Sequence, residues 1–232
     1  MVAKVISGRE VAETILTTDL KNKVIELNKK NIKPKLIVIL VGDMKASASY
    51  VAQKEKFAVK AGIESDVMRF EDSITETEIL DQIDAINKDK SVHGVIVQLP
   101  LPDHISVAKV LNRIDPSKDV DGFTPTNVGK LFLGEDTLVS CTPKGIMQML
   151  ASTGTDLNGK NVTVVGRSNI VGKPAAILCL QQNATVTMCH SRTKDLNAKL
   201  ADADVVIVAV GIPKFISGDQ IPSDSIVIDV GI

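Results

Sequence analysis

Lys54 occupies a position in this sequence that suggests acid–base chemistry. The segment Ser47–Ala61 predicts one helix, with Ser47 as its N-cap and Gly62 as the residue that ends it. At 3.6 residues per turn, Lys54 falls on a stripe of this helix that we predict faces inward. The residues of that stripe are Tyr50, Lys54, Phe57, Ala58 and Ala61.

Two interpretations of Lys54 stay open on spacing alone. A lysine beside apolar surface commonly extends its stem along that surface until the ammonium reaches water. A partly desolvated amine, however, loses its proton more readily and can act as a base near neutral pH. The pattern therefore makes Lys54 a candidate base without deciding between the two.

Two further polar residues are expected where ligands bind open α/β sheets, beyond the carboxyl ends of the strands. Gln98 comes directly after the apolar run Gly94–Val97, and Asp121 lies in the segment DPSKDVDGFTP. Taken alone, Gln98 is typical of a loop-facing amide, and Asp121 is typical of a turn carboxylate beside Gly122. Both positions are nevertheless suited to contact a ligand.

A second candidate site begins at the sequence GRSNIVGKP. This segment lies between a predicted strand, Val162–Val165, and a predicted helix from about Pro174 to Gln182. A glycine-containing turn that faces a helix N-terminus is typical of an anion site. The spacing from Gly166 to Gly172 is not GxGxxG, so the prediction of a dinucleotide site depends on the strand, turn and helix context.

The end of the next predicted strand, Thr185–Cys189, indicates which dinucleotide would bind. An NAD-selective site places an acidic residue there to hold the ribose 2′-hydroxyl, but this sequence continues with His190, Ser191, Arg192 and Thr193. A hydroxyl and a guanidinium suit a 2′-phosphate, and this favours NADP. The alternative is that Arg192 is simply solvated at a helix start. On the nicotinamide side we expect Gly211, Ile212 and Ile232, which follow the third and fourth strands.

The elements that position these residues predict an α/β fold with two domains. Short β-branched runs alternate with helical stretches, which is typical of parallel sheets covered by helices. The segment Asp115–Cys141 is predicted to be an irregular connection, and Thr142 is predicted to cap a helix that has Pro143 at its first position. We therefore expect an N-terminal catalytic domain at residues 1–140 and a Rossmann-like nucleotide-binding domain at 141–232. The predicted strands are Leu36–Val41, Val67–Phe70, Val92–Val97, Val162–Val165, Thr185–Cys189, Val205–Val210 and Ile226–Val230.

Composition excludes several other classes of protein. With 27 basic and 28 acidic residues, a formal charge of -1 and 3% aromatic residues, the chain lacks the features that nucleic-acid binding requires. Its apolar runs are shorter than a membrane span, and the N-terminus has no export signal, so we expect a cytoplasmic protein. The three cysteines, Cys141, Cys179 and Cys189, predict reduced core thiols. No His, Cys or carboxylate spacing suggests a metal site.

Five segments together resemble the methylenetetrahydrofolate dehydrogenase/methenyltetrahydrofolate cyclohydrolase family, in that family's order and spacing. They are SYVAQKEKFAVKAGI, GVIVQLPLP, DPSKDVDGF, GRSNIVGKP and CHSRT. The resemblance covers the chain from about residue 1 to its last residue. The family usually continues past VIDVGI into a glycine- and proline-rich loop and a helix, so we expect that a C-terminal segment is missing here.

The resemblance implies roles for individual residues. Tyr50 and Lys54 correspond to the catalytic tyrosine and lysine, Gln98 to the glutamine that orients the lysine, and Asp121 to the aspartate that anchors the pterin. At the cofactor the resemblance implies Gly166, Arg167, Ser168, Ser191 and Ile232, and the residue pattern described above adds Gly172, Arg192 and Gly211.

The implied activity is NADP-dependent oxidation of 5,10-methylenetetrahydrofolate, followed by hydrolysis of the methenyl product to 10-formyltetrahydrofolate. The resemblance also implies a homodimer whose small-molecule partners are one-carbon derivatives of tetrahydrofolate. Two other functions stay open on sequence. One is a shikimate-type NADP dehydrogenase, which shares the architecture but not the QLPLP and VDGF segments. The other is a catalytically silent nucleotide-binding or assembly module.

Overall fold

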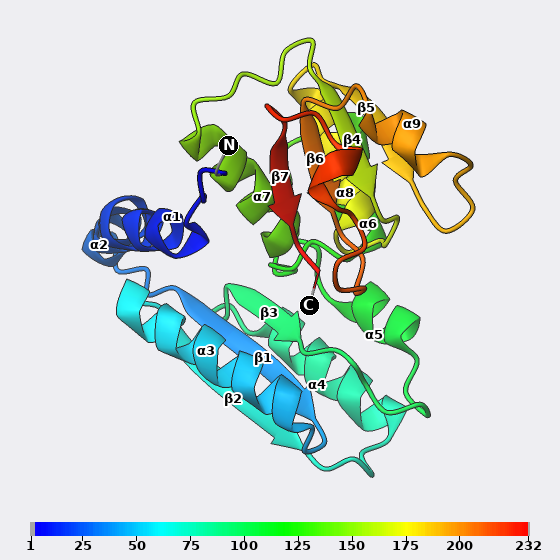
Figure 1. Ribbon diagram of the computed structural model, residues 1–232. Coiled ribbons are helices and arrows are strands. Elements are labelled where there is room, and N and C mark those ends of the chain that lie inside the picture. The colour runs from blue at the N-terminus through cyan, green and yellow to red at the C-terminus, as the bar shows by residue number, and fades with distance from the viewer. Residues whose placement is uncertain (1–2, 232) are drawn as a thin grey trace. The chain divides into compact units, whose positions relative to one another are not determined.

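The computed structural model describes residues 3–231, which form two compact units. One unit is Ser7–Asn127, and the other joins the N-terminal residues up to Ile6 to the chain from Val128 onward. Each unit has its own parallel sheet with helices packed against it (Figure 1). The predicted α/β fold with two domains is confirmed.

The sheet of the unit Ser7–Asn127 has its longest apolar strand in the middle. The strands are β1 (Lys35–Val41), β2 (Glu64–Phe70) and β3 (Gly94–Val97), in the order β2-β1-β3. All pairs are parallel, and Val38 is paired with both Val67 and Ile96. Because parallel strands need crossover connections, helices lie between consecutive strands and cover both faces of the sheet.

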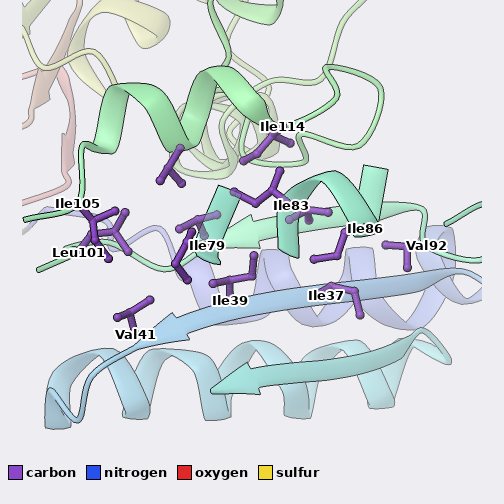
Figure 2. Packing of buried hydrophobic residues seen from close by; sticks show 13 residues of the cluster. Ile37, Ile39, Val41, Ile79, Ile83, Ile86, Val92, Leu101, Ile105 and Ile114 are labelled. Carbon is purple, nitrogen blue, oxygen red and sulfur yellow. The ribbon is translucent and has the colours of Figure 1, made fainter. Parts of the chain in front are cut away.

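The helices of this unit pack on the sheet through two apolar clusters. On one face, Ile37, Ile39 and Val41 of β1 contact Ile79 and Ile83, which belong to α4 (Figure 2). On the other face, the intervening strand residues pack against α3. Since successive side chains of a strand point to opposite faces, one apolar run supplies both clusters. The helices of this unit are α1 (Gly8–Ile15), the π-helical turn η1 (Leu16–Leu20), α2 (Lys21–Lys29), α3 (Lys45–Ala61), α4 (Glu76–Lys88) and α5 (Val107–Arg113). Helix α6 (Pro125–Leu133) begins in this unit and continues into the other one.

The sheet of the other unit has the strand order β5-β4-β6-β7, again parallel throughout. Helices α7 (Cys141–Ser152) and α8 (Gly172–Gln181) contribute to the cluster on one face, and α9 (Leu196–Leu200) contributes to the other. The short 3₁₀ turn η2 (Gly218–Gln220) precedes the last strand. The strands are β4 (Asn161–Val165), β5 (Thr185–Cys189), β6 (Val205–Val208) and β7 (Ile226–Asp229).

All the predicted strands are present, but several predictions about helix ends are wrong. Helix α3 begins after Met44, so Ser47 is not its N-cap and instead lies buried in its first turn. Helix α7 begins after Ser140, so Thr142 does not cap it. Pro143 still lies in the first turn, where its missing N–H group breaks no helical hydrogen bond.

Two further predictions about residues 115–141 are corrected. The stretch is not wholly irregular, because it contains α6. Cys141 is exposed, whereas Cys179 and Cys189 are buried free thiols. Among residues 3–231, no helix is both long and apolar enough to cross a membrane.

Candidate functional site

Lys54 lies at the border between the buried and exposed sides of α3. The buried side of this helix is formed by Val51, Ala58 and Ala61, and the Lys54 side chain is half-buried. The Lys54 Nζ donates a hydrogen bond of 3.1 Å to Oε1 of Gln98. The structure therefore brings together two residues that lie 44 positions apart in the sequence.

Gln98 is held so that its oxygen faces the lysine. Its backbone N–H donates to the carbonyl of Ile39, which extends the pairing of β3 with β1 beyond the last strand residue. Its side-chain Nε2 donates to the carbonyl of Leu99 at 2.9 Å. Because a carbonyl can only accept, this bond fixes the amide with Oε1 directed to the Lys54 amine. The Leu99–Pro100 peptide bond that follows is cis.

Asp121 is the third member of this group. Its side chain is half-buried, and burial raises the pKa of its carboxyl above the ordinary value. The charge of Lys54 acts in the opposite direction, and the neighbouring carboxylate of Asp119 adds to the increase. Lys54, Gln98 and Asp121 thus form one cluster within the unit Ser7–Asn127, in which the charge of Lys54 acts on the Asp121 carboxyl.

Tyr50 is placed one helical turn before Lys54 but is more exposed than the sequence predicts. Its side chain is 49% exposed and that of Phe57 is 50% exposed, so neither belongs to the buried stripe of α3. The predicted inward stripe is therefore rotated about the helix axis from the true one, and only Ala58 and Ala61 are fully buried on it. Tyr50 still shares a helix face with Lys54 and remains available to a bound ligand.

The glycine turn after β4 requires both of its glycines. Gly166 has a φ of +130°, a backbone conformation that residues with a side chain rarely adopt. An added Cβ would also overlap the carbonyl oxygen of Ala209. A Cβ on Gly172 would overlap the carbonyl oxygen of Gly166. The chain is thus folded so tightly at both positions that only glycine fits there, while residues 167–170 between them are exposed.

Ser168 organises the start of α8. Its Oγ accepts hydrogen bonds from the N–H groups of Val171 at 3.2 Å and Gly172 at 3.3 Å. The N–H of Lys173 donates to the Ser168 carbonyl. The sequence predicted that backbone N–H groups at this helix start would bind an anion. In the structure, those of residues 171–173 donate to Ser168 within the turn. Arg167 is exposed, and it forms no ion pair with any of residues 3–231.

The turn after β5 displays the residues expected at the 2′-phosphate. The N–H of His190 donates to Oγ1 of Thr193, and the N–H of Thr193 donates back to the His190 carbonyl. This turn leaves Ser191 and Arg192 exposed, and within the described chain Arg192 forms no ion pair. Because β5 is parallel to β4, this turn and the Gly166 turn lie at the same edge of the sheet.

A cavity of about 490 Å³ lies at the carboxyl ends of β6 and β7. Gly211, Ile212 and Gly231 are among its lining residues, so two of the positions expected on the nicotinamide side border an open space. Ile232, which was expected there as well, lies outside the described residues.

Sequence reasoning missed Asp119, a buried carboxylate two residues before Asp121. Its Oδ2 accepts hydrogen bonds from the N–H of Thr124 at 2.7 Å and from Nδ2 of Asn127 at 2.9 Å. The available signal was the second aspartate in the segment DPSKDVDGFTP, two residues before Asp121. The Asp119 carboxylate therefore holds the loop through these hydrogen bonds, and the Asp121 carboxylate lies near Lys54.

Two family models match this chain. The catalytic domain of tetrahydrofolate dehydrogenase/cyclohydrolase matches residues 6–121, and the NAD(P)-binding domain of the same family matches residues 140–232. The compact units of the structure divide between Asn127 and Val128. The boundary near residue 140 between functional domains stays a prediction.

Individual relatives agree with the family models. The bifunctional protein FolD of Bacillus subtilis (strain 168) is 52% identical over 232 residues, which are 100% of this chain and 82% of that protein. The crystal structure of the bifunctional FolD dehydrogenase/cyclohydrolase from Campylobacter jejuni has a TM-score of 0.96 and 44% identity, over 99% of this chain and 81% of that one.

A second solved structure is that of the FolD dehydrogenase-cyclohydrolase from Trypanosoma brucei, complexed with NADP cofactor and an inhibitor. It has a TM-score of 0.93 and 35% identity, and it covers 99% of this chain and 79% of that one. Together with the two domain matches, these likenesses show that the chain belongs to the tetrahydrofolate dehydrogenase/cyclohydrolase family.

Proposed function

We propose that Tyr50, Lys54, Gln98 and Asp121 form the folate site of this bifunctional enzyme, which oxidises 5,10-methylenetetrahydrofolate with NADP and hydrolyses the methenyl product. The observation that carries the proposal is the hydrogen bond from Lys54 to Gln98, with the Asp121 carboxyl close enough for the charge of Lys54 to act on its pKa. The proposed proton acceptor (Lys54), the amide that positions it (Gln98) and the proposed anchoring carboxylate (Asp121) therefore lie close together.

The hydrolytic step needs a base and an acid in turn. Water adds to the methenyl carbon and loses one proton, which leaves a hydroxyl on that carbon. The bond from the carbon to one ring nitrogen then breaks as the nitrogen is protonated, and the hydroxyl proton leaves to solvent as the formyl C=O forms. A neutral Lys54 amine can take the proton from water and return it to the departing nitrogen. In its neutral form the amine can donate one N–H to Gln98 and direct its lone pair to the water.

The residues of the second unit fit a dinucleotide. Residues 167–170 of the turn after β4 are exposed, and Arg192 has no ion pair within residues 3–231. We assign the pyrophosphate to the turn formed by Gly166, Arg167, Ser168 and Gly172, and the 2′-phosphate to Ser191 and Arg192. NADP, when bound, accepts the hydride that leaves the methylene carbon, and Gly211 borders the expected nicotinamide side.

A coupled assay on the purified chain tests this function. We expect NADP to support formation of methenyltetrahydrofolate, which then decays to 10-formyltetrahydrofolate faster than in buffer, and we expect NAD to support the oxidation less well. Absence of both activities would favour a silent nucleotide-binding module. A homodimer and a cytoplasmic location remain parts of the proposal that sedimentation and fractionation would check.

Arg192→Asp is expected to weaken the binding of NADP much more than the binding of NAD. The substitution replaces the partner of the 2′-phosphate with a like charge, and loss of a charge-assisted contact should raise the KM for NADP roughly tenfold or more. Lys144→Asp, an equal change of charge at an exposed position of α7, is the control and should alter neither KM. If Arg192→Asp raised the KM for NADP and the KM for NAD equally, Arg192 would not be the residue that recognises the 2′-phosphate.

Folate binding should weaken at acidic pH because of Asp121. Burial raises the pKa of this carboxyl, so it takes up a proton at a higher pH than an ordinary aspartate. A protonated carboxyl accepts hydrogen bonds from the pterin poorly, so the KM for folate should rise as the pH falls through that raised pKa. In Asp121→Asn this acid-side rise should disappear. Steady-state KM values against pH would refute the assignment if the variant kept the same rise.

A further inference from the structure

We propose that Lys118 is a positioning residue for folate binding, which acts by holding the loop that presents Asp121. The inference rests on the proposed role of Asp121 as the folate anchor. Lys118 itself is three residues away from Asp121 in the sequence, and its ammonium is bound at the end of α4.

The ammonium of Lys118 has all of its donors occupied. Its Nζ donates to the backbone carbonyls of Ile86 at 2.7 Å, Asn87 at 3.0 Å and Asp89 at 2.6 Å. A lysine ammonium has three N–H donors, so no donor is left over. The last carbonyls of a helix carry partial negative charge, and a cation there is stabilised. Lys118 thus attaches its loop to α4.

The backbone of the same segment is attached to β3. The N–H of Val95 donates to the carbonyl of Lys118 at 2.8 Å, and Val95 forms a parallel bridge with Asp119. Gln98 lies three residues after Val95 on the chain of β3, and Asp121 lies two residues after Asp119. One strand therefore sets the positions of both the residue that holds the Lys54 amine and the proposed pterin anchor.

Loss of the Lys118 ammonium should loosen the loop without removing any residue of the proposed site. The Asp121 carboxyl is half-buried, and this burial raises its pKa. If the attachment to α4 is lost, this carboxyl should become better hydrated and move away from its charged neighbours, Lys54 and Asp119. Its pKa should then fall toward the ordinary value.

The test compares Lys118→Met, Lys118→Arg and Lys109→Met. Lys109 forms an ion pair of 2.6 Å with Glu76 at the start of α4, so its loss perturbs the same helix at its other end. We expect Lys118→Met to raise the KM for folate about tenfold in both reactions, to leave the KM for NADP unchanged, and to shift the acid-side rise in folate KM to lower pH. Lys118→Arg should recover part of the loss. If Lys109→Met had the same effects, the role would be structural only.

A double-mutant cycle with Asp121→Ala separates this inference from the proposed function. If Lys118 acts through Asp121, the substitution Lys118→Met should add little to the folate KM of Asp121→Ala. If instead the two substitutions raised the folate KM by factors that multiply in the double variant, the inference would be overturned, while Asp121 would remain the anchor. An unchanged folate KM in Asp121→Ala alone would overturn the proposed role of Asp121, and the role of Lys118 would fail with it.

Discussion

Lys54→Met is expected to lower methenyl hydrolysis by at least about a hundredfold, the usual effect of losing a general base. Methionine keeps an unbranched stem at the half-buried position on α3 and removes only the amine that donates to Gln98. Folate and NADP should still bind, because Asp121 and the residues of the other unit are unchanged. Separate kinetics of the two half-reactions, with calorimetric binding of tetrahydrofolate, would measure these effects.

The two reactions should respond differently to this variant. Hydride transfer needs the methylene carbon held in place but no strong base, so dehydrogenase activity should fall less than hydrolysis. The control is Lys56→Met, which removes an exposed lysine from the same helix and should change neither reaction. An equal fall in both reactions would mean instead that Lys54 also serves the oxidation.

Gly166→Ala is expected to impair use of NADP severely. The added methyl group would overlap the carbonyl oxygen of Ala209, and the residue would have to keep a φ of +130° that alanine avoids. Strain of this kind costs about 1–3 kcal/mol before the overlap is counted. We expect kcat/KM for NADP to fall at least about tenfold, while methenyl hydrolysis is retained because Lys54 and Gln98 lie in the other unit.

Gly145→Ala is the matched control for this substitution. Gly145 lies inside α7, and an added Cβ would meet no atom within 4 Å. Alanine favours a helix over glycine by about 0.5–1 kcal/mol, so this variant should be slightly more stable and fully active. Thermal unfolding of both variants would show the contrast, and a Gly166→Ala enzyme with normal NADP kinetics would contradict the assigned turn.

The strands could be predicted because β-branched runs bounded by turn residues have few other interpretations. It was harder to predict which side of a helix is buried, since α3 carries apolar residues on several sides. Tyr50 and Phe57 are exposed while Val51 is buried, and periodicity alone did not distinguish them. Helix α6 was missed because its sequence, PTNVGKLFL, contains proline and glycine and follows a turn-rich stretch. In both places, packing against the rest of the unit decides the structure.

The candidate site was predictable from sequence only in part. Gln98 was found from its position after a strand, Asp121 from its place in the segment DPSKDVDGFTP, and both from the family resemblance, yet each alone was typical of an ordinary loop residue. The contact between Lys54 and Gln98 joins two βα units, and no local pattern contains it. The same holds for Lys118, whose partners at the end of α4 lie about 30 residues earlier in the chain.

The most direct test of the folate site is a single reaction in which methenyltetrahydrofolate is formed from the methylene substrate with NADP and then followed until it disappears. In the unmodified enzyme we predict that the methenyl compound appears briefly and is hydrolysed. In Lys54→Met it should accumulate and decay only at the rate seen in buffer, with NADP still being reduced. Decay in Lys54→Met at the rate of the unmodified enzyme would contradict the assignment of Lys54 as the base.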